Sequence, residues 1–130
     1  MDFRDEKDYI MRMIKEMARV LFSLMLGKQY TSVELPEESK YEVSGKTLEE
    51  LKKMADEGFI NEAENLLLEN IDYHHKEEVL AAISFYQYIG EKDTDFLKEH
   101  NYSKEEALDG IKRLADQQGY GQICSLLMKT

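Results

Sequence analysis

Hydrophobic and polar positions alternate with a helical period along most of the chain, most clearly in its first segment. Between residues 5 and 27, polar side chains recur every three or four positions and form one narrow stripe, whereas nearly every other position is apolar. This pattern predicts one long helix that ends at Gly27. Because the polar stripe is narrow, we expect this helix to be covered around most of its circumference.

Residues 29–46 lack a helical period. Pro36 and Gly45 interrupt regular structure there, and β-formers such as Val33 and Tyr41 are scattered through the segment. We interpret it as a surface connector between the first helix and the rest of the chain, with a short extended piece.

Residues 47–130 are predicted to be helical in several shorter pieces. Apolar side chains follow a helical period over residues 76–90, where Gly90 ends the pattern. A short helical turn is expected at "DTDFLKEH" and a short helix at "QICSLLMK". Three other helix starts are indicated by the spacing of a capping box, namely Thr47 with Glu50, Asn61 with Glu64, and Ser103 with Glu106.

Together these elements predict the all-α fold class. A chain of 130 residues is long enough to bury a core without disulfides, and a single Pro leaves room for long helices. We expect one domain over residues 1–130, with a long apolar helix (1–28), a connector (29–46) and a body of antiparallel helix pairs (47–130).

The stretch "EGFINEAENLLLENID", residues 57–72, predicts the turn and second helix of such a pair. Closely packed helices need a small residue where their axes approach, which Ala63 provides, and Gly58 allows the chain to reverse. Here the sequence resembles a tetratricopeptide unit, with Gly58 as the turn glycine, Ile60 as the apolar turn residue, and Ala63 and Leu67 as the small and large packing residues.

This resemblance covers roughly residues 47–118 and implies a tetratricopeptide-like helical bundle that binds a protein segment in a groove. By position, the groove would include Lys52, Asp56, Ile83 and Tyr86. The whole chain is also similar to a small family of uncharacterised bacterial proteins, which open with the same kind of helix as "DYIMRMIKEM". That second resemblance implies a fold and leaves the activity open.

The first helix also carries a pattern that suits self-association. Five apolar residues follow spacings of four, three, four and three, as in a seam between two helices. The sequence therefore favours a homodimer, and the alternative is a core helix wrapped by its own domain. The seam consists of Ile10, Ile14, Met17, Leu21 and Leu24.

The charge of the chain limits its partners. The formal net charge is −10, and it is uneven: residues 1–28 carry six Lys or Arg against five Asp or Glu, and the remainder carries 11 against 22. An acidic body repels phosphate backbones, which argues against nucleic-acid binding. From Arg12 to Lys28 the first helix has four basic residues and one acidic residue, so attachment to a membrane surface is a weaker alternative.

Candidate chemistry is sparse. His74 and His75, with Glu77 and Glu78, have the helical spacing of metal-ligand pairs, but two ligands do not make a tight site and a solvated helix start is the favoured explanation. Cys124 lies in an apolar run, where a buried inert thiol is usual. We identify no catalytic constellation and no glycine-rich phosphate loop, so the sequence predicts no cofactor.

The predicted function is a non-enzymatic protein-interaction or scaffold module. A small metal-dependent enzyme that uses His74 and His75 is the alternative from another class. The single cysteine fits a reducing compartment, and the acidic N-terminus does not suit a signal peptide. No segment approaches the roughly 20 apolar residues of a membrane-spanning helix. We therefore expect a cytoplasmic protein.

Overall fold

The computed structural model describes residues 3–27 and 42–128. The described residues form helices joined by short turns, with a single two-stranded hairpin, which confirms the all-α fold class. The elements are α1 (Phe3–Leu26), β1 (Glu42–Val43), β2 (Lys46–Thr47), α2 (Leu48–Asp56), α3 (Ile60–Glu69), α4 (Lys76–Gly90), α5 (Thr94–Glu99), α6 (Lys104–Gln117) and α7 (Gly121–Met128).

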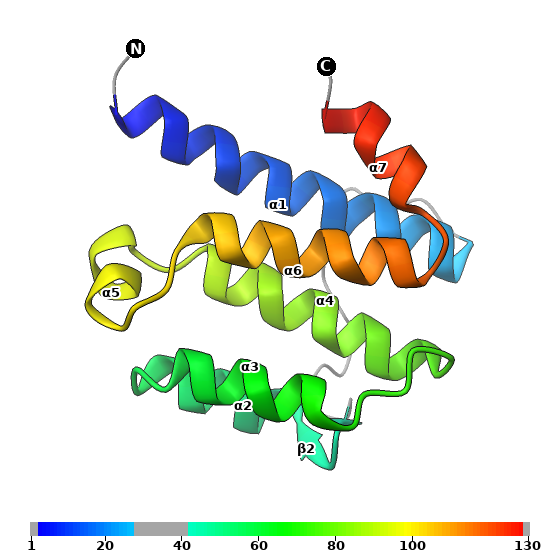
Figure 1. Cartoon of the computed structure of the whole chain (residues 1–130), viewed down its shortest axis with the longest axis horizontal. Helices are drawn as coiled ribbons and strands as arrows, with labels where there is room; N and C mark the ends of the chain where they lie inside the picture. The colour runs from blue at the N-terminus through cyan, green and yellow to red at the C-terminus, as the bar shows by residue number, and fades with distance from the viewer. Residues whose placement is uncertain (1–2, 28–41, 129–130) are drawn as a thin grey trace.

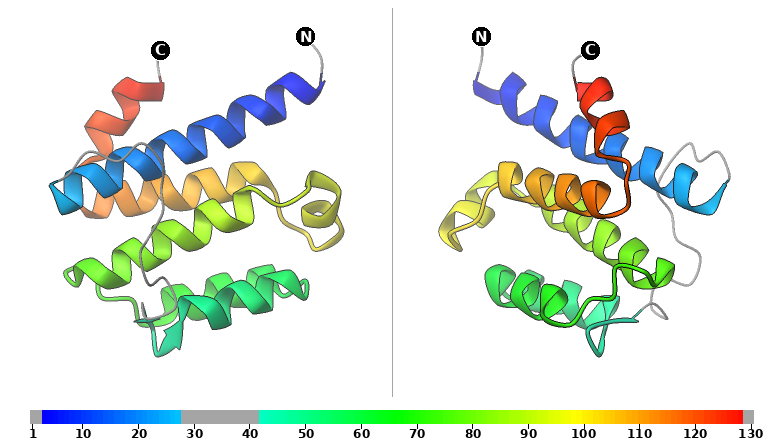
Figure 2. Two further views of the ribbon diagram at one scale, coloured as in Figure 1. Left: turned by 180° about the vertical axis from the view of Figure 1, so that it is seen from behind. Right: turned by 45° about the vertical axis from the view of Figure 1, so that its right-hand side comes forward.

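The helices are arranged in three layers (Figures 1 and 2). Helices α4 and α6 form the middle layer, α1 packs across both of them on one side, and α2 and α3 lie on the opposite side. The short α7 contacts α6 and α1, so α1 and α7 together form one end of the molecule. The α2–α3 pair forms the other end.

The long helix α1 has the predicted extent and is followed by Gly27, which has a positive φ of 68° and donates its backbone N–H to Ser23 O at 2.9 Å. Its burial differs from the prediction. The buried side chains between Ile14 and Met25 follow alternating spacings of three residues and one residue, so they lie on one side of the helix. Tyr9 and Leu24 remain exposed. The chain's own helices therefore cover α1 on one side only, so the alternative of a core helix wrapped entirely by its own domain is wrong.

The helix that is enclosed on most sides is α4. It contacts α1, α2, α6 and β1, and ten of its 15 residues are buried. It therefore forms the centre of the bundle. A run of small residues, Ala81, Ala82 and Ser84, lets the neighbouring helices approach its backbone.

The α2–α3 pair begins as predicted but turns differently. Thr47 caps α2 by accepting a hydrogen bond from the backbone N–H of Glu50 at 3.1 Å. The expected cap at Asn61 is wrong, because α3 already begins at Ile60 and Phe59 occupies the cap position. The side-chain amide of Asn61 instead donates to the carbonyl oxygens of His100 and Asn101, at 3.3 and 3.2 Å.

Gly58 is required at the turn between α2 and α3. Its φ is +96°, and a Cβ there would lie 2.5 Å from Cε1 of His100. The imidazole ring therefore packs directly on the glycine backbone, and it also contacts the Phe96 ring at 4.7 Å between centroids. Together with the Asn61 amide, this contact fixes α5 and the residues after it to the α2–α3 turn.

The predicted extended piece is the β1–β2 hairpin. Ser44 and Gly45 have φ values of 53° and 79°, the pair of positive values that a two-residue hairpin turn requires. Ser44 Oγ donates to Leu67 O at 2.7 Å, which ties the hairpin to the end of α3. Residues 28–41 of the predicted connector lie outside the described residues.

The later helices were predicted well. Ser103 and Glu106 form a complete capping box at the start of α6. The predicted short helices appear as α5 and α7. Within the described part of the chain, no helix has the combined length and apolarity needed to cross a bilayer.

Candidate functional site

The four predicted groove residues do not share one surface. Ile83 and Tyr86 are fully buried in the bundle, so their side chains cannot line a groove. Lys52 and Asp56 lie at the surface, and the aromatic residue they meet is Tyr88. The inner-face groove expected from the tetratricopeptide resemblance is therefore wrong, because α6 packs on the side of α4 from which Tyr86 projects.

Tyr88 is the centre of a polar cluster that joins α2 to α4. Its hydroxyl donates to Asp56 Oδ1 at 2.7 Å, and Lys92 Nζ donates to the same oxygen at 2.5 Å. Lys52 Nζ and Lys92 Nζ each lie 4.8 Å from the centroid of the Tyr88 ring. The Tyr88 ring thus engages both ammonium groups, and the Asp56 carboxylate also accepts from Lys92.

The proton equilibria of this cluster follow from these contacts. Burial alone would raise the pKa of Asp56, but the hydrogen bonds from Lys92 and Tyr88 outweigh it and hold that pKa below its usual range. The hydrogen bond to Asp56, aided by burial, raises the pKa of Tyr88 to about 12. Tyr88 is therefore a protonated hydrogen-bond donor at neutral pH, and the cluster is a surface clamp between helices.

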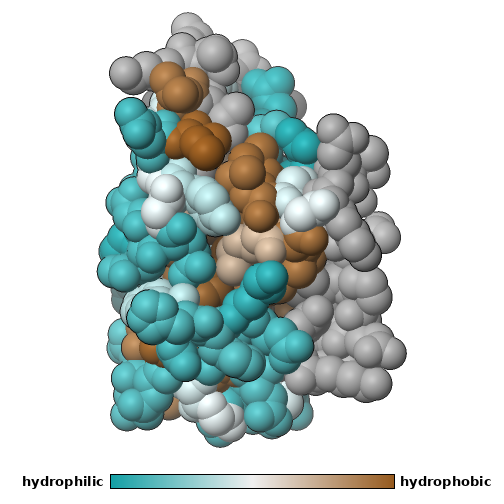
Figure 3. All heavy atoms as spheres, turned by 90° about the vertical axis from the view of Figure 1, so that its right-hand side faces the viewer, coloured by the Kyte–Doolittle hydropathy of each residue, from teal (hydrophilic) through white to brown (hydrophobic). Residues whose placement is uncertain are grey.

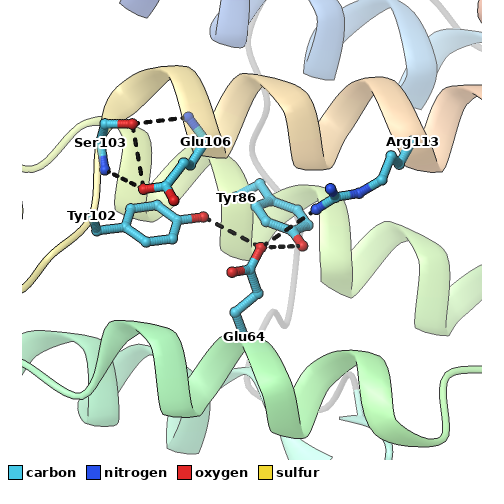
Figure 4. A network of polar contacts seen from close by, with 6 residues as sticks. All are labelled: Glu64, Tyr86, Tyr102, Ser103, Glu106 and Arg113. Carbon is cyan, nitrogen blue, oxygen red and sulfur yellow. Dashed lines mark hydrogen bonds and ion pairs between the residues drawn. The ribbon is translucent and has the colours of Figure 1, made fainter.

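A second polar network joins α3, α4 and α6 (Figure 4). Glu64 Oε2 accepts hydrogen bonds from the hydroxyls of Tyr86 at 2.8 Å and Tyr102 at 3.4 Å. Arg113 from α6 approaches the same oxygen at 3.7 Å. Glu64 is mostly enclosed, with 16% of its side chain exposed, whereas the Arg113 side chain is 63% exposed. One carboxylate therefore satisfies two buried phenols.

The Tyr86 ring reaches Glu64 because α6 carries Gly110 at the crossing point. A Cβ at position 110 would lie 2.7 Å from Cδ1 of Tyr86 and closer still to Cε1 and Cζ. Burial and the negative charge of Glu64 raise the pKa of both Tyr86 and Tyr102. Both phenols stay protonated at neutral pH, so they act as donors to Glu64 and not as general bases.

The candidate metal ligands are arranged as a solvent-exposed helix start. His74 donates its backbone N–H to Asp72 Oδ1 at 2.9 Å, and His75 Nδ1 lies 3.4 Å from Glu78 Oε2. Glu77 is exposed in the first turn of α4. Among the residues that the structure describes, no three His, Cys, Asp or Glu side chains come together as a metal site would need. The side chain of Cys124 lies outside the described atoms.

The predicted self-association seam on α1 is largely internal. Ile14, Met17 and Leu21 are buried in the core of their own chain, so they cannot form a contact with a second molecule while the bundle is folded. Ile10 is half-buried against the same core, and only Leu24 of the five is exposed. The prediction that these five residues form a contact between two molecules is therefore wrong, because their heptad spacing reflects packing on α4 and α6 of the same chain.

A different set of apolar side chains is exposed on α1 and α7. Large apolar residues in the described part of the chain are exposed at only three places: α1, α7 and Phe59 in the α2–α3 turn. Figure 3 shows apolar side chains gathered over α7 and the surface below it. We call the apolar set at this end of the molecule the α1–α7 surface; it consists of Tyr9 (47% exposed), Leu24 (38%), Ile123 (42%) and Leu126 (62%).

The α1–α7 surface also differs in charge from the rest of the molecule. Residues 42–120 carry nine Lys or Arg against 19 Asp or Glu, a net charge of −10. Helix α1 carries five basic residues and four acidic residues, and residues 121–128 of α7 carry no charge. The acidic α2–α3 layer lies at the opposite end of the bundle (Figure 1). Sequence reasoning missed α7 as part of a surface, although its apolar, uncharged composition was a usable signal.

Comparison with known proteins leaves the function open. No curated protein and no solved structure matches the chain. A family model does match, over residues 4–119, which span α1 to α6 and most of the chain. The protein therefore belongs to the family described as a family of unknown function, DUF6483.

Proposed function

We propose that this protein is a non-enzymatic protein–protein interaction module that self-associates through the α1–α7 surface. The observation that carries the proposal is the exposure of Ile123 and Leu126 next to the exposed side of α1. Isolated apolar residues are common on protein surfaces, but apolar side chains gathered on neighbouring elements are typical of contact surfaces.

The magnitudes favour an interface that uses both helices. Full burial of one Leu-sized side chain contributes about 1.5–3 kcal/mol, so a half-exposed one contributes roughly 1 kcal/mol. Two copies together bring eight such side chains, which contribute on the order of 8 kcal/mol. Association costs about 4–15 kcal/mol in lost translational and rotational freedom. Removing two of these side chains from each copy is therefore expected to abolish association.

The charge distribution supports the same surface. Two copies whose bodies each carry a net charge of −10 over residues 42–120 repel one another in most orientations. Contact through α1 and α7 places the least acidic ends together and keeps the two α2–α3 layers far apart. A homodimer with this geometry is also the common form of self-association in soluble proteins.

The proposal is tested by multi-angle light scattering at micromolar concentration. We expect the full chain to be a dimer and the Ile123→Glu, Leu126→Glu double variant to be a monomer with unchanged helical circular dichroism. Both substituted side chains are exposed, so the substitutions do not enter the core. The control is Phe59→Glu, which introduces one carboxylate at an apolar residue that is 51% exposed but lies on the α2–α3 turn.

The control variant should remain dimeric. A wild-type protein that is monomeric under these conditions would overturn the proposal. A dimer that persists in the double variant would show that self-association uses another surface. Binding to anionic vesicles that is lost in the double variant, together with a monomeric wild type, would favour attachment to a membrane surface instead.

We also propose that the α2–α3 pair is a single tetratricopeptide-like unit within this module, in a bacterial cytoplasm. Ile60, Ala63 and Leu67 are fully buried on one side of α3, as the resemblance requires. The single cysteine of the chain fits a reducing compartment.

A further inference from the structure

We propose that a groove on the outward side of α3 binds a basic amphipathic helix of another protein. The groove has a volume of about 660 Å³ and is lined by Glu62, Asn65, Leu66, Leu68 and Glu69, all of them residues of α3. Helix α3 lies at the end of the bundle opposite α7 (Figure 1). The groove is therefore separate from the surface proposed for self-association.

The outward side of α3 has an apolar centre between two carboxylates. The fully buried residues of α3 lie on the side that packs on the bundle. Glu62, Asn65, Leu66 and Glu69 follow spacings of three, one and three, so they share the other side. Leu66 lies between the two glutamates, with Leu68 beside it. Both leucines are half-buried, so each packs partly on the core and leaves the rest of its side chain to the groove.

The two glutamates determine which charge the groove accepts. Glu62 and Glu69 are exposed, and neither carboxylate has a hydrogen bond or an ion pair with any residue that the structure describes. Glu64, on the inward side, is instead held by the network in Figure 4. Helix α3 carries no Lys or Arg that could neutralise the pair. Because Glu62 and Glu69 are seven residues apart, they are separated by about 10 Å along the helix axis.

A helix with basic residues at the same spacing complements this side of α3. Lys or Arg side chains seven residues apart would reach both carboxylates, and apolar side chains three and four positions after the first would fill the centre. Opposite charges at the rim of a contact favour this partner over an acidic one. The groove is open along its length, whereas a small-molecule site encloses most of its ligand, so a protein segment is the better fit.

Two synthetic peptides and a charge reversal test this proposal on the full-length protein. The peptides are Ala-rich helices of equal length, with two leucines between two positions that are seven residues apart and carry Lys in one peptide and Glu in the other. Fluorescence anisotropy measures their binding to the wild type and to the Glu62→Lys, Glu69→Lys double variant, whose folding is checked by circular dichroism. The matched control is Glu77→Lys, Glu105→Lys, which changes the net charge equally at exposed residues outside α3.

We expect the Lys peptide to bind the wild type and the control at least tenfold more tightly than the charge-reversed variant, and the Glu peptide to prefer the charge-reversed variant by a similar factor. A Lys peptide that does not bind the wild type, or that binds the wild type and the charge-reversed variant equally, would overturn the proposal. Equal loss of binding in the control would also overturn it, because the attraction would then be non-specific.

Light scattering on the charge-reversed variant distinguishes a second copy of this chain from another protein. We expect the self-association of this variant to match that of the wild type. If the charge reversal abolishes self-association, the occupant of the groove is a second copy and the proposal fails. The α1–α7 surface is tested by different substitutions, at Ile123 and Leu126, so either proposal can fail while the other stands.

Discussion

The contact between Gly110 and Tyr86 gives the sharpest test of how the bundle is packed. In an exposed helix interior, replacing Gly by Ala stabilises a protein by about 1 kcal/mol, because Ala loses less conformational freedom on folding. In α6, the added methyl group would lie 2.7 Å from Cδ1 of Tyr86 and nearer to two other ring carbons. Helix propensity and packing therefore predict opposite signs for Gly110→Ala.

The structure indicates that packing outweighs propensity at this position. The Tyr86 ring is fully buried and its hydroxyl is held by Glu64 at 2.8 Å, so the ring cannot move aside freely. Overpacking typically costs about 1–3 kcal/mol. Displacing the hydroxyl from a charged acceptor adds about 1.5–3 kcal/mol. After subtracting the propensity gain, we expect Gly110→Ala to lower the free energy of unfolding by about 1.5–5 kcal/mol.

The assay is urea unfolding followed by far-ultraviolet circular dichroism. The matched control is Asp109→Ala, an exposed neighbour in the same helix, which we expect to leave the free energy of unfolding within about 0.5 kcal/mol of wild type. In a Tyr86→Leu background, which removes the ring, Gly110→Ala should become stabilising. A Gly110→Ala protein that is more stable than wild type would refute the proposed close packing of α6 on Tyr86.

Two further predictions concern single polar side chains. Lys104 is buried, and its ammonium donates to Gly90 O at 2.7 Å and to Lys92 O at 2.6 Å at the end of α4. Because these hydrogen bonds would be lost, Lys104→Met should lower the free energy of unfolding by about 2 kcal/mol. Lys98→Met, at an exposed position, should have little effect in the same urea assay. Tyr88 has a pKa raised to about 12 from 10.0, so its contribution to stability is complete below pH 10 and is lost as the pH rises towards 12. Asp56→Asn should lower the midpoint of the Tyr88 titration towards pH 10. The midpoint is measured by ultraviolet titration, as the difference between proteins with and without the Tyr88→Phe substitution. An unchanged midpoint would contradict the assigned hydrogen bond.

Local patterns predicted the helices because helix starts and stops are encoded nearby. Ser103 and Glu106 are three residues apart, and Thr47 caps α2 through a residue three positions away, so both caps can be identified without the fold. Asn61 has the same spacing to Glu64, yet both side chains are used elsewhere. Asn61 binds carbonyl groups 39 and 40 residues away, and Glu64 binds Tyr86 and Tyr102.

The assignment of surfaces failed for a related reason. Apolar spacing shows which side of α1 is buried but not what covers it, and the seam from Ile14 to Leu21 packs on helices of its own chain. The tetratricopeptide pattern predicted the α2–α3 turn at Gly58 but placed Tyr86 on a groove. Gly110 lies 24 residues later, and only the folded chain shows that it brings α6 against the Tyr86 ring.

The residues matched by the family model end just before α7. The matched residues, 4–119, contain the close contacts of Gly58, Gly90 and Gly110, which hold α1 to α6 together. Helix α7 begins after them, at Gly121, and exposes Ile123 and Leu126. Helix α7 also packs on α6 and α1, but the most exposed apolar side chain of the α1–α7 surface, Leu126, lies outside the matched residues. Substitutions of the exposed Ile123 and Leu126 should consequently change association without changing the stability of the fold, which makes the two properties separable by experiment.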